Sequence, residues 1–316
     1  MKDLRLARDI LKSGDYELLE LLFDSVPDVL SQLIRTAFVP SPGCRLIVSD
    51  FSAIEARVIA WLAGERWVID TFKGHGKIYE MTASRMFNVP IEKIAKGNPE
   101  YELRAKGKLA TLACGYQGGV GALKAMGAER MGLSEEELSG IVSAWRKANP
   151  SIVRLWHDVE EAAITAIREK KAVSLQRGLR FFYKSGMLLI RLPSGRSLAY
   201  ARPRIEADTR FGRDKITFEG LDQTTKSWGR IDTYGGKIAE NLTQAIARDC
   251  LAEAMLRLDR ARYRIVAHIH DEVVLDVPKG EGSLEEVNKI MSRPIDWAAG
   301  LPLNAEGFEA EHYKKD

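Results

Sequence analysis

Cysteine and long apolar runs are both scarce in this sequence. The 316 residues include three cysteines, Cys44, Cys114 and Cys250, which are odd in number and far apart. They form neither a disulfide framework nor a C-x-x-C metal site, which favours a reducing compartment. No apolar run approaches the ~20 residues of a transmembrane helix, and the amphipathic N-terminal pattern lacks a signal-peptide core. We therefore expect a soluble, cytoplasmic protein without a membrane partner.

An excess of charge of either sign is also missing. Charged residues make up 29% of the chain, yet the formal net charge is only +3. Such a mildly basic balance permits a nucleic-acid partner but does not argue for one. Internal repeats and low-complexity tracts are absent, and 45% hydrophobic residues are enough for one large or two modest domains.

The order of the periodic segments predicts an α+β fold. Residues 1–35 have helical periodicity, and "CRLIVSDFS" at 44–52 has the composition of a short buried strand that ends in a charge. Helical periodicity then dominates 54–169, whereas 178–221 alternates and contains glycine and proline, as antiparallel strands do. A long helix over 236–258 and a hairpin over 265–277 complete a sheet that a helical insertion interrupts.

The predicted hairpin "IVAHIHDEVVLDV" has no glycine at its tip. Tight two-residue turns usually recruit Gly, Asn or Asp-Gly, because these residues tolerate positive φ. Here the tip carries Asp271 and Glu272, with His270 beside them. A solvated turn is the simplest interpretation of an isolated "DE" pair, and a metal site is the alternative.

Three further motifs each allow a structural and a functional interpretation. In "LIVSDFSAIEARVIAWLAG", Asp50 ends a buried strand and is either a ligand or, like Ser52, the cap of a helix that begins near Ile54. In "RAKGKLATLACGYQGG", one helix face carries Arg104 and Lys108 together with Leu112, Gly115 and Tyr116. That face suits a polyphosphate or simply water.

The third motif, "ENLTQAIARDCLAEAMLRL", combines an apolar and a polar stripe. Its apolar stripe is Ile238, Leu242, Ile246 and Cys250. Its polar stripe of Asn241, Gln244 and Arg248 either reads the edge of a groove or faces water.

Taken in order, these motifs resemble those of family A (DNA polymerase I type) DNA polymerases, most closely the bacteriophage and prophage variants. "DFSAIEAR" is similar to the first palm motif, "RAKGKLATLACGYQGG" to the fingers-helix motif and "HDE" to the last palm motif. The resemblance runs from about Ser31 to the C-terminus. It implies a right-hand palm, an antiparallel sheet with helices, and mostly helical fingers. The implied limits are 1–60 for the first part of the palm, 61–200 for the fingers and 201–316 for the second part of the palm.

The resemblance also implies a role for each matching residue. Asp50, Asp271 and the Phe51 carbonyl would bind two Mg²⁺ ions, for which Mn²⁺ can substitute, and Glu272 would be an accessory acid. Glu55 would lie under the sugar, Arg104 and Lys108 would hold the triphosphate, with Lys108 also catalytic, and Tyr116 would guard the base-pair pocket. The primer–template contacts would be Gln244, Arg248, His270 and Asn241.

Three positions depart from the family pattern. Leu112 stands where an aromatic residue often stacks on the incoming base, and Tyr79 stands where many members have a triphosphate-binding histidine. Asn241 is one residue away from the family's position on the polar helix.

The implied function is template-directed DNA synthesis in a bacterial or phage-infected cell, with primer–template DNA and dNTPs as partners. Only about thirty residues precede the resemblance, too few for a thumb or an exonuclease domain. We therefore expect both to be absent, DNA binding to be weak and salt-dependent, and synthesis to be distributive without proofreading. An N-terminal half or an accessory subunit is then a further candidate partner. The alternatives are a catalytically weak polymerase-like module that binds DNA, and a template-independent transferase.

Overall fold

The computed structural model describes residues 4–208 and 213–314, which form two compact units. Unit 1 consists of Met1–Ser52, Leu251–Arg293 and Leu303–Asp316, and unit 2 consists of Ala53–Cys250 and Pro294–Pro302. The boundary at residues 250 and 251 falls within one long helix. The predicted palm and fingers limits differ from these and stay predictions.

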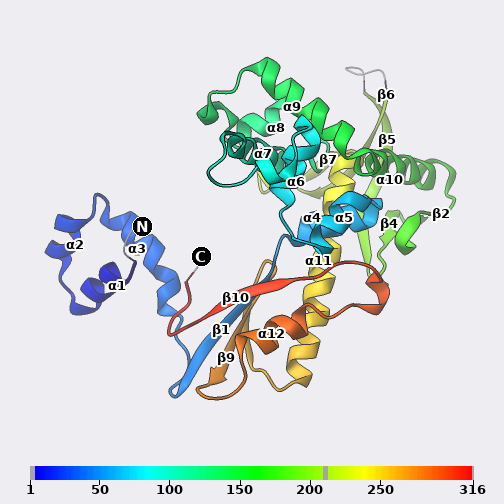
Figure 1. Ribbon diagram of the computed structural model, residues 1–316. Helices are drawn as coiled ribbons and strands as arrows, with labels where there is room; N and C mark the ends of the chain where they lie inside the picture. The colour runs from blue at the N-terminus through cyan, green and yellow to red at the C-terminus, as the bar shows by residue number, and fades with distance from the viewer. Residues whose placement is uncertain (1–3, 209–212, 315–316) are drawn as a thin grey trace. The chain divides into compact units, whose positions relative to one another are not determined.

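Unit 1 contains a four-stranded antiparallel sheet in the order β10-β1-β9-β8. Figure 1 shows β1, β9 and β10 side by side, and helix α12 packs on β1 and β10. The elements of the sheet region are β1 (Cys44–Phe51), β8 (Ile265–Ile269), β9 (Glu272–Pro278), α12 (Leu284–Met291) and β10 (Ala305–Ala310). The long segment between β1 and β8 confirms the predicted interruption of a sheet.

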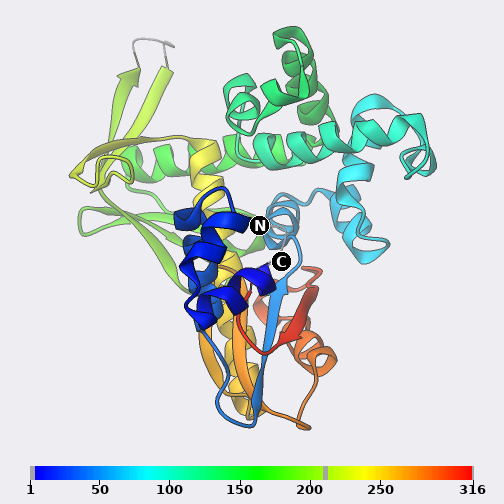
Figure 2. The same ribbon diagram turned by 90° about the vertical axis from the view of Figure 1, so that its left-hand side faces the viewer.

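The N-terminal helices of unit 1 bury a small apolar cluster of their own. They are α1 (Leu4–Ser13), α2 (Tyr16–Leu22) and α3 (Val26–Leu33), followed by the 3-10 helix η1 (Ile34–Ala37). Ala7, Leu19 and Val29 are among the cluster's buried residues. Figure 2 shows these helices, in blue, packed against one another. The helical periodicity predicted over 1–35 is thus confirmed for the part that the structure describes.

Strand β1 is buried because it lies between two neighbours and under α12. Its residues from Leu46 to Ser49 are all buried, without the alternation of a sheet that faces water on one side. On one face, Leu46 and Val48 pack with Val274 of β9 and Tyr313. This core fixes the register of β1 and places Asp50, the residue before its last, at a defined position.

The helices of unit 2 pack on one another in pairs and small groups. They are α4 (Ile54–Ala63), α5 (Arg66–Lys73), α6 (Ile78–Phe87), α7 (Leu103–Cys114), α8 (Val120–Ala125), α9 (Glu135–Ala148) and α10 (Pro150–Glu169), with 3-10 turns at η2 (Ile91–Lys93), η3 (Pro99–Glu102), η4 (Ala128–Met131), η5 (Gln176–Gly178) and η6 (Asp296–Ala298). Helices α6, α7 and α9 contact one another, and α4 contacts α5 and α10. Residue 107 is glycine where α6 and α7 approach: a Cβ there would lie 2.3 Å from the Tyr79 carbonyl oxygen.

A six-stranded antiparallel sheet completes unit 2 in the sequential order β2 to β7. The strands are β2 (Val173–Ser174), β3 (Arg180–Lys184), β4 (Met187–Arg191), β5 (Ser197–Asp208), β6 (Arg213–Leu221) and β7 (Trp228–Thr233). Helix α10 packs against it, as Figure 2 shows. The alternating region 178–221 is therefore confirmed as antiparallel strands, except for 209–212, which lie outside the described residues.

The long predicted helix is α11 (Gly235–Arg260). Its apolar stripe is confirmed, because Ile238, Leu242, Ile246 and Cys250 are all fully buried. On its polar stripe Gln244 and Arg248 are exposed, whereas Asn241 is half-buried. Within the part of the chain that the structure describes, no helix is long and apolar enough to span a bilayer.

Candidate functional site

Three carboxylates lie in one row across the sheet of unit 1. Asp50 of β1 is paired with Glu272 of β9 on one side and with Glu306 of β10 on the other. Residues directly opposite each other on neighbouring strands project to the same face of a sheet. The end of β1 therefore presents three acidic side chains to one face.

The β8–β9 turn brings Asp271 to the same end of the sheet. The backbone N–H of Phe51 donates to the carbonyl oxygen of Asp271 at 3.3 Å. Asp50 and Asp271, 221 positions apart in the sequence, thus come from adjoining segments because β1 and β9 are paired. This is the adjacency that a shared metal site requires.

His270 takes the positive φ that a glycine usually takes in a tight turn. Ile269 pairs with Glu272, so His270 and Asp271 are the two central turn residues, and His270 has a φ of 55°. A non-glycine residue in this left-handed region costs roughly 1–2 kcal/mol. Backbone strain of this kind often accompanies functional sites, which favours a role for the exposed imidazole.

The neighbouring acids perturb Glu272. Burial raises the pKa of Glu272, and the charges of Asp50 and Asp271 raise it further, while a hydrogen bond from Tyr313 and the charge of Arg35 oppose the rise. The Tyr313 hydroxyl donates to Glu272 Oε1 at 2.7 Å. Burial and this carboxylate together raise the pKa of Tyr313 to about 12. The carboxylates of Asp50, Asp271 and Glu272 thus repel one another, and a bound cation would reduce this repulsion.

The donor chemistry of this site fits a hard divalent cation. The groups implied as ligands, the carboxylates of Asp50 and Asp271 and the carbonyl of Phe51, offer only oxygen, which Mg²⁺ prefers. Among the described residues, no group of three or more His, Cys, Asp or Glu side chains is arranged to hold a metal. That agrees with the usual Mg²⁺ site, which takes one or two carboxylates and completes its shell with substrate phosphates and water.

In unit 2, two cations of α7 gather around Tyr79 of α6. The Arg104 guanidinium lies 5.4 Å and the Lys108 ammonium 5.9 Å from the centroid of the Tyr79 ring. Arg104 also donates through Nε to Glu80 Oε1 at 2.7 Å, which raises the pKa of Arg104. The Arg104/Lys108 face is therefore organised by α6 through Tyr79 and Glu80.

A second polar group in unit 2 centres on Glu55 of α4. The hydroxyl of Tyr116 donates to Glu55 Oε2 at 2.8 Å, and Gln244 Nε2 lies 3.5 Å from Glu55 Oε1. Burial and the Glu55 charge raise the pKa of Tyr116 well above its usual range. The tyrosine is therefore a neutral donor that holds the carboxylate of Glu55 in one orientation.

The other predicted positions lie as follows. Leu112 is 47% exposed on α7, which leaves its side chain free to contact a ligand. Asn241 donates to the hydroxyl of Tyr200 at 2.9 Å, so its amide already has a protein partner. The structure brings together Asp50, Phe51, His270, Asp271 and Glu272 in unit 1. In unit 2 it forms two separate groups, Tyr79 with Arg104 and Lys108, and Glu55 with Tyr116 and Gln244.

One alternative interpretation is wrong. Neither Asp50 nor Ser52 is the N-cap residue of α4: that residue is Ala53, in a left-handed conformation with φ 52°, and its methyl side chain cannot accept a hydrogen bond. Asp50 cannot cap because it is still paired within the sheet. Its position is therefore not explained by a helix end.

Sequence reasoning missed four residues that shape the two groups. Glu306 and Tyr313 come from the C-terminal strand and the residues after it, which match none of the motifs. Arg35 precedes the first motif, and Glu80 lies one residue after Tyr79. Only Glu80, 24 residues before Arg104 in the sequence, could be guessed, through the charge complementarity of two adjacent helices.

Comparison with known proteins places these features in context. The model of the family "DNA polymerase family A" matches residues 25–315. The DNA polymerase of Bacillus phage SP02 is 59% identical over 316 residues, which cover 100% of this chain and 48% of that protein. The thermostable DNA polymerase I of Thermus aquaticus is 28% identical over 284 residues, which cover 88% of this chain and 28% of that protein.

A solved structure shares the fold. The POL domain of Pol1 from M. smegmatis, in complex with DNA primer-template and dNTP, matches with a TM-score of 0.57 and 24% identity over 89% of this chain and 42% of that chain. The chain spans about half the length, 48%, of the SP02 relative.

Proposed function

Because the chain belongs to DNA polymerase family A, we propose that it catalyses template-directed DNA synthesis, transferring a nucleotide from a dNTP to a primer 3′-hydroxyl. The observation that carries this proposal is the convergence of Asp50 and Asp271 at one end of the paired strands β1 and β9. The chain spans only part of its relatives, so the activity of the whole relative is carried over here as part of the proposal.

Members of this family use divalent metal ions, and we assign their binding to Asp50, Asp271 and the Phe51 carbonyl, with Glu272 as an accessory acid. Mg²⁺ held by these groups would make the primer hydroxyl more acidic and would offset the negative charge on the departing pyrophosphate. A strand end and a tight turn hold such ligands more rigidly than long loops would. The raised pKa of Glu272 is consistent with a group that shares a negative site and is not itself a principal ligand.

The residues of unit 2 bind the nucleotide in this proposal. Arg104 and Lys108 hold the triphosphate, where fixed positive charge also stabilises the charge that develops in the transition state. Tyr79 positions both cations through its ring. Leu112 contacts the incoming base in place of an aromatic residue.

The Glu55 group selects the sugar. Glu55, held by Tyr116 at 2.8 Å, occupies the space that a 2′-hydroxyl would need, and Tyr116 borders the base-pair pocket. On the DNA side, the exposed Gln244, Arg248 and His270 contact the primer–template near its terminus, with Asn241 as a further contact. A primer–template is bound in the solved M. smegmatis complex, and this supports the same partner here.

A primer-extension assay with a labelled primer tests the proposal. We expect extension with a template and a divalent ion, in the order that the template dictates. DNA binding without any extension would instead identify a polymerase-like binding module. Extension of the primer without a template would identify a template-independent transferase.

A further inference from the structure

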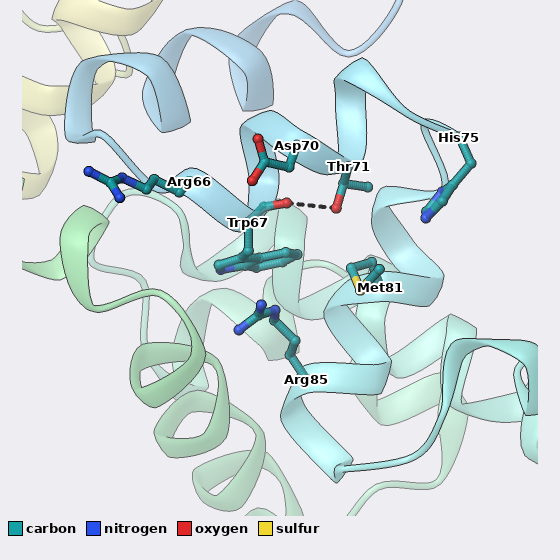
Figure 3. A pocket seen from close by; sticks show the side chains of 7 residues that line it. All are labelled: Arg66, Trp67, Asp70, Thr71, His75, Met81 and Arg85. Carbon is teal, nitrogen blue, oxygen red and sulfur yellow. Dashed lines mark hydrogen bonds between the residues drawn. The ribbon is translucent and has the colours of Figure 1, made fainter.

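A trough on α5 and α6 of unit 2 has no role in the proposed reaction. It has a volume of about 430 Å³, and five of its lining residues carry the argument: Arg66, Trp67, Asp70, His75 and Arg85 (Figure 3). It does not belong to the Arg104/Lys108 face. Arg85 follows Tyr79 by six residues, which turns it by about 120° around α6.

Trp67 is a fixed aromatic wall of this trough. Its indole Nε1 donates to the carbonyl oxygen of Ala148 at 2.9 Å, which ties α5 to the end of α9. The side chain is half-buried against the apolar cluster that includes Val68 and Phe72. The ring therefore cannot swing freely, and its orientation is set before any ligand arrives.

Arg85 is stacked on that wall with its donors unused. Its guanidinium lies 4.9 Å from the centroid of the Trp67 ring, and Figure 3 shows it beneath the indole. Within residues 4–208 and 213–314, neither Arg85 nor Arg66 has a carboxylate partner or donates a hydrogen bond. A stacked guanidinium keeps its planar fork of N–H groups pointing outward, and that fork matches the geometry of a phosphate.

The remaining polar groups of the trough could contact both the phosphate and the base of a nucleotide. Nδ1 of His75 accepts the backbone N–H of Lys77 at 3.0 Å, so Nε2 of a neutral imidazole is the protonated nitrogen and a donor. The exposed Lys73, at the end of α5, and Lys77, in the loop that follows, add positive charge near His75. Asp70 is the one carboxylate among the lining residues, and it can accept from an amino group of a base.

We propose that this trough binds a single strand of DNA, with a phosphate on Arg85 and Arg66 and a base beside the stacked pair of Trp67 and Arg85. Proteins that bind single-stranded DNA commonly use arginine side chains to contact the phosphates and aromatic side chains to stack on the bases. A volume near 430 Å³ admits a nucleotide unit but not a duplex. The inference rests on the proposed function, because a polymerase works next to an unpaired template strand.

The test measures binding of a short fluorescent oligothymidylate by anisotropy at several salt concentrations. The trough variant is Arg66→Gln/Arg85→Gln. The control variant, Arg154→Gln/Arg180→Gln, removes the same charge from two exposed arginines of unit 2 that likewise have no ion pair among the described residues. We expect the trough variant to bind about a hundredfold more weakly than the control, about tenfold per arginine. The slope of log K against log salt should become shallower by about 0.7, the value for one lost phosphate of a single strand.

Two further arms remove the remaining ambiguity. Asp70→Asn takes away the one negative charge and should tighten oligothymidylate binding. Free dTMP and inorganic phosphate, added as competitors, separate a strand site from a mononucleotide or phosphate site.

The proposal is overturned if the trough variant binds the oligonucleotide within about twofold of the control, which is below the effect of one phosphate contact. It is also overturned if the variant loses dTMP binding and keeps oligonucleotide binding. Circular dichroism confirms that the compared variants are folded. Because the readout is binding and not extension, failure here and failure of the proposed polymerase activity give different results.

Discussion

At the scale of the residue, Lys108 is the clearest test of the nucleotide site. Lys108→Ala removes an exposed cation that Tyr79 positions, and we expect kcat/KM for the dNTP to fall about a hundredfold, as for other charges aimed at a developing negative charge. Affinity for primer–template DNA should change little. The matched control is Lys106→Ala on the same helix, where the lysine pairs with Glu137 at 3.4 Å. Loss of DNA affinity with intact nucleotide use would assign the basic face to the duplex.

Glu55 makes a separate prediction about the sugar. Shortening it to alanine opens the space beside Tyr116, so ribonucleotide incorporation should rise about tenfold or more relative to deoxyribonucleotide incorporation, the usual effect of relieving one steric contact. Glu55→Gln, which keeps the size and loses the charge, should retain most of the discrimination. The exposed Glu161→Ala is the control. An unchanged selectivity ratio in Glu55→Ala would leave Glu55 with only a structural role.

Glu272 predicts a pH dependence of stability. Its pKa in the folded chain is raised above the ordinary value of 4.5, first by burial and further by Asp50 and Asp271. The folded state therefore holds this proton more tightly than the unfolded state, and the contribution of Glu272 to stability falls as pH rises through the raised pKa. Glu272→Gln stays neutral, so without metal its free energy of unfolding should exceed that of the wild type at neutral pH.

Denaturant unfolding across about pH 4 to about pH 8 checks this, because the difference between Glu272→Gln and wild type should close as the wild-type carboxyl becomes protonated. The exposed Glu285→Gln on α12 is the control and should track the wild type at every pH. A constant difference across the range would show that the raised pKa is not felt in stability.

At the scale of the element, the packing of α6 on α7 should control the Arg104/Lys108 face. A Cβ at Gly107 would lie 2.3 Å from the Tyr79 carbonyl oxygen, so Gly107→Ala must push the two helices apart. We expect a loss of about 1–3 kcal/mol in the free energy of unfolding, together with weaker dNTP use. Gly140→Ala, in the interior of α9 with nothing within 4 Å of its new Cβ, should instead stabilise by about 0.5–1 kcal/mol. Equal effects of the two changes on stability would contradict the account of this helix pair.

The elements themselves were largely predictable, because their signals are local. The run of apolar residues before Asp50 predicts β1, the spacing of Ile238, Leu242 and Ile246 predicts α11, and two β-branched runs predict the β8–β9 hairpin. Turn and cap chemistry was less predictable: the left-handed φ of His270 and of Ala53 arises at non-glycine residues, where tertiary context overrides the local preference.

Long-range partners carry no such local signal. Two contacts depend on the pairing of β10 with β1: the hydrogen bond from Tyr313 to Glu272 and the pairing of Asp50 with Glu306. The sequence near Asp50 contains no signal that predicts this strand pairing. The contact between Arg104 and Glu80 likewise needs two helices to pack. The sequence thus predicts the motif residues of the candidate site, but it does not predict the residues that position them.

At the scale of the whole molecule, the proposed DNA synthesis needs residues from both units. The sheet of unit 1 supplies the carboxylates, and the helices of unit 2 supply the cations and the Glu55 group. The sheet alone offers negative charge without a nucleotide site, and the helices alone offer charge for a triphosphate without metal ligands. Removing a carboxylate should therefore abolish the chemistry and leave the nucleotide-binding residues in place.

The measurement that tests this most directly is primer extension by Asp50→Ala and Asp271→Ala beside Asp259→Ala, an exposed aspartate of α11 in the same unit. We predict that each of the first two loses at least about a hundredfold in extension rate, while the control keeps wild-type activity and all three stay folded by circular dichroism. Extension within about tenfold of wild type by either Asp50→Ala or Asp271→Ala would contradict the assignment of the metal site to the paired ends of β1 and β9.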